Sequence, residues 1–261
     1  MTLWKQELRA GRVFLAAWAA AVAFLTAICI LIYPEMAGQM EEISGIFSQM
    51  GGFSQAFGMD RLSFGEFLGF FGVECGNVLG LGGALFAALI GIQALAREEK
   101  EHTAEFLLTH PVSRTRVVFE KLLAVFTQIF LLNAAVLLVT LLSVALIGES
   151  PDGKTLALLF LAYFLLQLET AAVCFGISAF LRQGGPGLGL GIAALFYFLN
   201  LVANLTRKAE FLKYLTPFGY AESADVIMNG RLSGGYLAAG LFLGLAGVAA
   251  AFWWYERKDI A

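Results

Sequence analysis

Charged side chains are scarce in this chain of 261 residues. Lys, Arg, Asp and Glu together make up 14% of the sequence, whereas 59% of the residues are hydrophobic. A soluble domain of ordinary composition carries about 25% charged residues, so this composition indicates a membrane protein. The net charge of −3 says little about partners, because the charge of a membrane protein is read loop by loop.

Histidine and cysteine are also rare. The two histidines, His102 and His110, lie together in one charged segment, so no metal-binding set of side chains can be assembled inside the apolar segments. The three cysteines lie within apolar runs and lack the spacing of disulfide or metal ligands: Cys29, Cys75 and Cys174. We therefore expect no metal site and no cofactor on this chain.

What the chain does contain is long apolar runs. Six of them reach the length that crosses a bilayer, about 20 residues, and none shows the alternation of a barrel strand. The sequence therefore predicts an all-α integral membrane protein with one transmembrane domain, 1–261. The expected spans are 13–33, 67–96, 117–147, 156–181, 188–205 and 234–255.

The distribution of Lys and Arg predicts the orientation. If the N-terminus lies inside, eleven of the 17 basic residues fall in inner segments and six in outer ones. Cytoplasmic loops carry the excess of Lys and Arg. We therefore expect a protein of the bacterial plasma membrane with both termini on the cytoplasmic side. Four of the six outer cations share one loop: Arg207, Lys208, Lys213 and Arg231.

Two outer loops are long enough to hold structure of their own. In 34–66, apolar residues recur at helical steps, which predicts a helix on the membrane surface or a plain connector packed on the spans: Met36, Met40, Ile43, Phe47 and Met50. In 206–233, Pro217 and Gly219 separate two short apolar stretches, which predicts a helix, a break and a second helix.

Small residues form a stripe along the second span. They recur at steps of three or four and let another helix approach closely: Gly65, Gly69, Gly72, Gly76, Gly80, Ala84 and Ala88. We expect Gly72, Gly76 and Gly80 to lie in a helix contact or a dimer interface. The same spacing joins Gly187 to Gly191 and Gly240 to Gly244.

One literal motif is rejected on physical grounds. The run from Gly148 to Thr155 fits G-x-x-x-x-G-K-[ST], the loop that cradles nucleotide phosphates. That loop needs a strand before it and a helix after it in a soluble fold, whereas here a predicted span precedes it. Pro151 also removes one backbone N–H, and two carboxylates would repel phosphate. The chain therefore carries no ATPase motif of its own.

Polar side chains inside spans are candidates for a site. Charged groups there cost on the order of 3 kcal/mol, so each must meet a partner or a wet cavity. The candidates for a substrate cavity are Glu74, Asn77, Glu169 and Asn200, with Gln128, Asn133, Gln167 and Asn204 as polar companions. The alternative is that these groups only join neighbouring helices by hydrogen bonds.

The segment 97–121 is a charged insert between two apolar runs. Its start is densely charged, Phe106, Leu107 and Leu108 form an apolar patch, and Pro111 ends the helical pattern. This pattern is typical of a short helix on the inner membrane surface with a charged flank open to a cytoplasmic partner. A basic loop that merely anchors the spans is the alternative.

The run TAEFLLTHPVSR with a following lysine resembles the segment after the second span of ABC-2 type transporter permeases, G-T-x-E-x-L-L-x-x-P-V-S-R and then K. The matching residues are Thr103, Glu105, Leu107, Leu108, Pro111, Val112, Ser113, Arg114 and Lys121. His102 stands where the family commonly has Gly. The resemblance extends to the six-span layout, to Tyr214–Phe218 and to the C-terminal RKDI, so it covers nearly the whole chain.

The resemblance implies an ABC-2 (ABCG-like) exporter architecture in which two permeases pair and each receives a separate cytoplasmic ATPase. ATP and Mg would then bind the ATPase, and this chain would not be an enzyme. The segment 97–113 would be the coupling helix that contacts the ATPase. The residues expected to couple to it are Glu98, Glu101, Thr103, Glu105, Leu107, Leu108, Pro111 and Arg114.

The predicted function is transport of a substrate, by export of an amphipathic peptide, lipid or drug, driven by ATP. Expected partners are two ATPase subunits, a second permease subunit that forms a homodimer with the first, and membrane lipids, with no nucleic acid. Two alternatives stay open: an intramembrane lipid-modifying enzyme that uses Glu74 and Glu169 as acid and base, and a membrane scaffold without transport activity.

Overall fold

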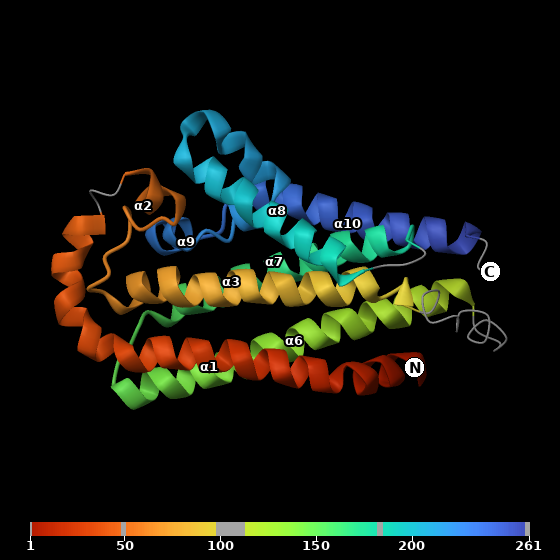
Figure 1. Ribbon diagram of the computed structural model, residues 1–261, viewed down its shortest axis with the longest axis horizontal. Coiled ribbons are helices and arrows are strands. Elements are labelled where there is room, and N and C mark those ends of the chain that lie inside the picture. The colour runs from red at the N-terminus through yellow and green to blue at the C-terminus, as the bar shows by residue number, and fades with distance from the viewer. Residues whose placement is uncertain (1, 48–50, 98–112, 182–184, 259–261) are drawn as a thin grey trace.

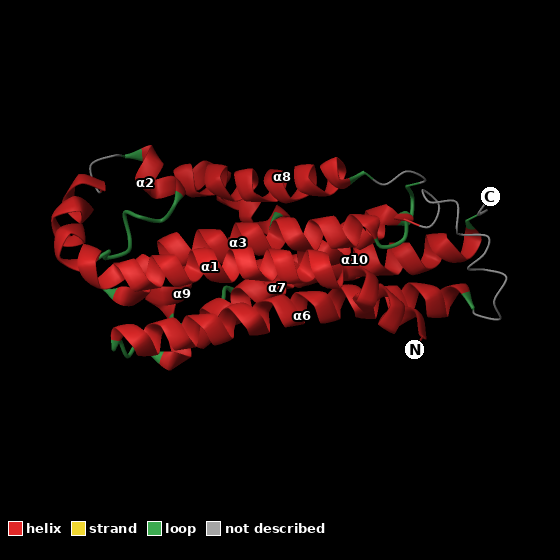
Figure 2. Ribbon diagram, turned by 60° about the horizontal axis from the view of Figure 1, so that its bottom comes forward, coloured by secondary structure: helices red, strands yellow, loops and turns green. Residues whose placement is uncertain are grey.

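A computed structural model describes residues 2–47, 51–97, 113–181 and 185–258 of the chain. Within these ranges all regular elements are helices (Figure 2). The α-helices are α1 (Thr2–Phe47), α2 (Gly52–Ala56), α3 (Phe67–Gln93), α6 (Arg114–Ile147), α7 (Gly153–Ser178), α8 (Pro186–Leu205), α9 (Ser223–Asn229) and α10 (Gly234–Arg257), and the 3-10 helices are η1 (Arg207–Leu215) and η2 (Pro217–Gly219).

Six helices of the described chain are long and apolar enough to cross a membrane: α1, α3, α6, α7, α8 and α10. The prediction of an all-helical, six-span architecture is therefore confirmed. The largest difference between a helix and its expected span is at α1, which begins well before residue 13 and continues beyond residue 33. Its first turns are polar, so the helix extends beyond the apolar run that hydropathy detects.

The helices α3 and α7 form the centre of the bundle and are its most buried spans. In Figure 1, α1 and α6 lie on one side of α3, and α8 and α10 lie on the other. Both chain termini lie at the same end of the bundle, which we call the terminal end. The elements α2 and α9 lie at the other end, which we call the opposite end.

The surface helix predicted for 34–66 is not a separate element. The helix α1 runs through Pro34 as far as Phe47, and the short α2 follows. Figure 1 shows that α1 turns sharply before its C-terminal end, and a proline inside a helix is the usual cause of such a kink. The predicted helix, break and helix of 206–233 are present as η1, η2 and α9.

Glycines set how closely α7 approaches its neighbours. A Cβ added at Gly176 of α7 would lie 2.7 Å from the Cα atom of Gly247 in α10, and one added at Gly91 of α3 would lie 2.7 Å from the carbonyl oxygen of Ala171. These helices therefore touch backbone to backbone, which a side chain at either position would prevent. Within the described chain, a Cβ added at Gly187 or Gly191 has no neighbour within 4 Å, so this pair makes no close helix contact there.

We predict that Gly247→Val destabilises the protein, whereas Gly191→Val leaves its stability nearly unchanged. Valine at 247 would collide with the backbone of α7, and overpacking of a tight contact costs about 1–3 kcal/mol. Valine at 191 has room. Thermal unfolding of both purified variants in detergent checks this, and an equal loss in the two variants would contradict the helix contact.

Candidate functional site

Most residues predicted to couple to an ATPase lie outside the described part of the chain. They are Glu98, Glu101, Thr103, Glu105, Leu107, Leu108 and Pro111. The residues on either side of this segment are described, and they connect it to α3 before and α6 after. The attachment of the segment to the bundle can therefore be read from its two flanks.

Arg114 joins the start of α6 to the end of α10. Its Nη1 donates to the carbonyl oxygen of Lys258 at 2.6 Å, and to those of Glu256 and Tyr255 at 3.3 and 3.4 Å. The last carbonyl groups of a helix lack partners within the helix and carry a partial negative charge. A guanidinium from another helix satisfies them, so the first residue of α6 holds the C-terminus of α10.

Two lysines close other helix ends in the same way. Lys121 of α6, only 1% exposed, donates from Nζ to the carbonyl oxygen of Ala94 at the end of α3, at 2.7 Å, and to Glu7 Oε1 of α1 at 3.0 Å. Lys258 donates to the carbonyl oxygens of Ala179 and Leu181 beyond α7, at 2.9 and 3.0 Å. Cations thus cap the C-termini of three spans at the terminal end.

A carboxylate caps the N-terminus of α1. Glu120, next to Lys121 in α6, accepts from the backbone N–H of Trp4 at 3.1 Å and from Nε of Arg116 at 2.9 Å. A carboxylate is favourable beside the free N–H groups of a first helical turn. We call Glu7, Arg114, Glu120, Lys121 and Lys258 the terminal clasp, because together they connect α6 to α1, α3 and α10, and α10 to α7.

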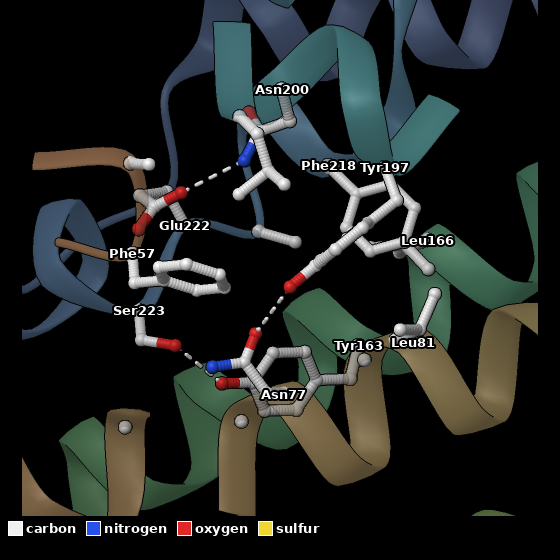
Figure 3. A pocket seen from close by; sticks show the side chains of 16 residues that line it. Phe57, Asn77, Leu81, Tyr163, Leu166, Tyr197, Asn200, Phe218, Glu222 and Ser223 are labelled. Carbon is white, nitrogen blue, oxygen red and sulfur yellow. Dashed lines mark hydrogen bonds between the residues drawn. The ribbon is translucent and has the colours of Figure 1, made fainter. Parts of the chain in front are cut away.

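A polar cavity lies at the opposite end and contains two predicted site residues, Asn77 and Asn200 (Figure 3). Tyr197 of α8 donates from its hydroxyl to Oδ1 of Asn77 of α3 at 3.1 Å. Asn200 donates from Nδ2 to Oε2 of Glu222 at 2.9 Å, and Asn204 donates to the same oxygen at 2.9 Å. These bonds join α8 to α3 and to the segment before α9.

The size of this cavity limits what it can hold. Its volume is about 40 Å³, which is room for a few water molecules. Pockets that enclose drug-sized ligands measure about 300–1,000 Å³. An amphipathic cargo therefore does not fit inside the chain at Asn77 and Asn200.

Glu169 lies elsewhere, at the contact between α7 and α10. Its side chain is 4% exposed, and a Cβ added at Gly240 would lie 2.8 Å from its carboxyl carbon, so Gly240 provides the space that the carboxyl group fills. It interacts electrostatically with Tyr220. Within the described chain, neither its carboxyl oxygens nor the Tyr220 hydroxyl has a hydrogen-bond partner.

Glu74 is not in the cavity either. It lies half-buried on α3, where its electrostatic neighbours are Cys29 of α1 and Cys75. The cavity with Asn77 and Asn200 is lined by neither Glu74 nor Glu169. The structure thus separates the four predicted cavity residues into one pair, Asn77 and Asn200, and two single carboxylates.

The glycine stripe of α3 packs inside the chain. A Cβ at Gly72 would lie 2.7 Å from the Ile227 side chain of α9, and one at Gly76 would lie 2.5 Å from the Tyr163 hydroxyl of α7. Gly80 faces the ring of the same tyrosine. The Tyr163 hydroxyl in turn shares a hydrogen bond of 2.8 Å with Ser223. These three glycines therefore lie in contacts with α7 and α9 of the same chain.

The run that fits the phosphate-binding motif forms a turn between two helices. Gly148 ends α6 in the left-handed conformation, with φ 75°. Asp152 caps α7 by accepting from the N–H of Thr155 at 3.0 Å and from its hydroxyl at 2.6 Å. These bonds lower the pKa of Asp152. Because a helix precedes the turn instead of a strand, the geometry of a nucleotide loop is not met.

Sequence reasoning missed Lys258, Glu7 and Glu222 as site residues. In the sequence Lys258 counts only as an inner charge, although a basic residue beside helix ends at a membrane surface is a signal for capping. Glu7 stands in the polar first turns of α1, and Glu222 stands close to Asp225 in the loop before the last span. Their partners lie far away in the sequence, so spacing gave no indication of the pairs.

Comparison with known families gives one result. Residues 1–260 match the family model described as ABC-2 family transporter protein. The match covers nearly the whole chain, including the segment 98–112 and the terminal clasp. No curated protein matches the chain.

We predict that Glu169→Gln is at least as stable as the wild type. The substitution removes an ionisable group that lacks a hydrogen-bond partner among the described residues, and it keeps the shape that fits against Gly240. Gly240→Ala should destabilise, because the added Cβ meets the carboxyl group. Melting temperatures in detergent check both. A clear loss of stability in Glu169→Gln would mean that the carboxylate has a bonded partner.

Proposed function

Because the chain belongs to the ABC-2 family of transporter proteins, we propose that this multi-pass membrane permease is driven by a separate cytoplasmic ABC ATPase that binds the segment 97–113. ATP and Mg bind that ATPase. The terminal end then faces the cytoplasm, which places both termini there and agrees with the excess of basic residues in the expected inner segments. The cell membrane of a bacterium is the proposed location.

The terminal clasp is the observation that supports the proposed coupling between the segment 97–113 and the spans. The segment 97–113 leads directly into Arg114, which holds the end of α10, and Lys121 follows two turns later and holds α3 and α1. A charge-assisted hydrogen bond is about twice as strong as a neutral one. When ATP closes the ATPase pair and displaces the segment, these bonds make α1, α3 and α10 move with it. The bond of Lys258 makes α7 move with α10.

We place the transport path between two permease subunits. The polar cavity within the chain has a volume of about 40 Å³, which does not admit a peptide, lipid or drug. The larger cavities of the described chain are open to its surface. A path for such a cargo therefore needs a second wall, supplied by a second copy or a sister subunit. Export is the proposed direction, and an amphipathic molecule is the proposed cargo.

The alternative of an intramembrane enzyme has less support. It requires Glu74 and Glu169 in one cavity, to act as acid and base on one lipid. Glu169 faces Gly240 of α10, whereas Glu74 interacts with Cys29 of α1. Two carboxylates on different sides of the bundle do not act on the same bond.

We predict that Leu107→Asp/Leu108→Asp abolishes binding of the ATPase. The two leucines form the apolar patch of the segment proposed to contact it, and a buried charge opposes such a contact. Co-purification of the permease with the ATPase checks this in detergent, together with ATP hydrolysis. The control Leu241→Asn/Leu245→Asn changes two exposed leucines of α10 and should leave the complex intact. An intact complex in the Leu107→Asp/Leu108→Asp variant would refute the proposed contact.

We predict that Arg114→Gln still binds the ATPase but loses about tenfold of the permease-dependent stimulation of ATP hydrolysis. Hydrogen bonds to a charged group contribute about 1.5–3 kcal/mol, and the variant removes those that hold α10. Arg114→Lys should restore part of the stimulation. The control Arg257→Gln changes an exposed arginine whose described contacts stay within α10. Equal stimulation in Arg114→Gln and wild type would exclude this route.

A further inference from the structure

Four basic residues surround an open cavity at the opposite end. The cavity has a volume of about 790 Å³ and lies where α8 ends and η1 begins. Arg61, Arg207, Lys208 and Lys213 line it, against two acids, Asp60 and Glu210. These four are most of the six basic residues in the expected outer segments, where the positive-inside rule predicts few.

The acids near the cavity already have partners, and two of the cations do not. Asp225 pairs with Lys213, at 3.2 Å, and with Arg61. Glu210 accepts a hydrogen bond from the Tyr236 hydroxyl at 3.1 Å. Arg207 and Lys208 are exposed, and no ion pair or hydrogen bond joins either side chain to a described residue. Two positive charges of the cavity are therefore available to a ligand.

The position of these two cations is not explained by local structure. Arg207 and Lys208 occupy the first turn of η1, where the helix dipole disfavours positive charge. They also stand on the side of the membrane where cations are uncommon. An anion bound between them would offset both effects.

An apolar stripe on α8 leads to the cavity. Leu195, Phe198, Val202 and Leu205 are spaced by three, four and three residues, so they lie on one face of the helix. All four are exposed, Phe198 by 61%. Leu205 also lines the cavity. The stripe therefore runs from within the span to the cations at its end.

We propose that this surface binds an anionic phospholipid from the membrane leaflet at the opposite end, independently of the proposed ATPase coupling. Arg207 and Lys208 bind the headgroup phosphate, and an acyl chain lies along Leu195, Phe198 and Val202. The order of the two parts matches the order in a bilayer, with phosphate beyond the end of the span and hydrocarbon beside it.

Native mass spectrometry of the full chain in detergent tests the site. The ligands are phosphatidylglycerol and phosphatidylcholine with identical acyl chains. Arg207→Gln/Lys208→Gln should bind phosphatidylglycerol about 30-fold more weakly, because each basic residue near the surface contributes about a factor of five. Its affinity for phosphatidylcholine should not change. The matched control Lys154→Gln/Arg231→Gln removes two exposed cations outside the cavity and should keep wild-type affinity.

Two further arms separate the lipid from other occupants. Glycerol phosphate, the headgroup without chains, should bind the wild type far more weakly than the lipid, and Phe198→Ala should weaken lipid binding while the chain stays folded. Glycerol phosphate that binds as tightly as the lipid would make this a site for free phosphate and overturn the proposal. So would a Phe198→Ala variant that changes the oligomeric mass and not the lipid affinity, because the stripe would then be a contact between copies.

Discussion

The backbone contact of α7 with α10 and α3 is the feature around which the other helices are arranged. In a bilayer, apolar side chains gain little by leaving lipid for protein, so helices associate through close packing and hydrogen bonds. Gly176 meets Gly247 at the contact with α10, and Gly91 meets Ala171 at the contact with α3. Gln167 of α7 adds polar links, since it accepts from Asn133 of α6 at 2.6 Å and donates to the carbonyl oxygen of Leu79 of α3 at 3.3 Å.

The two ends of this bundle are closed by different means, and the difference has a mechanical consequence. At the terminal end, each cation of the clasp caps a helix other than its own, so no spanning helix of the group α3, α7 and α10 ends independently. At the opposite end, side chains from several elements meet Glu222, Ser223 and Asp225 at the start of α9. A displacement applied near Arg114 thus reaches several spans at once.

The sequence predicts the spans well and their contacts poorly. Long apolar runs determine the number and order of the helices, and the resemblance around Thr103–Arg114 identifies the family. A glycine pair shows that one face of a helix carries small residues. Because every face of a span is apolar, the spacing does not indicate whether that face contacts protein or lipid. Gly240 and Gly191 illustrate this: the first packs against Glu169, and the second meets open space. The clasp was missed for a related reason, because Lys258 and Ala179 are distant in the sequence.

The segment between α8 and α10 supports the proposal that a large cargo moves between two subunits and not through one chain. Pro217, Phe218 and Gly219 are buried, so η2 fills the opposite end of the bundle. It is held in place by Thr216, which donates to the carbonyl oxygen of Phe196 at 2.8 Å, and by the bonds of Glu222 and Ser223. Each such bond contributes about 1 kcal/mol, and all of them must break before the chain opens internally. Movement of whole subunits against each other breaks none of them, and it also leaves α7 packed on α3 and α10.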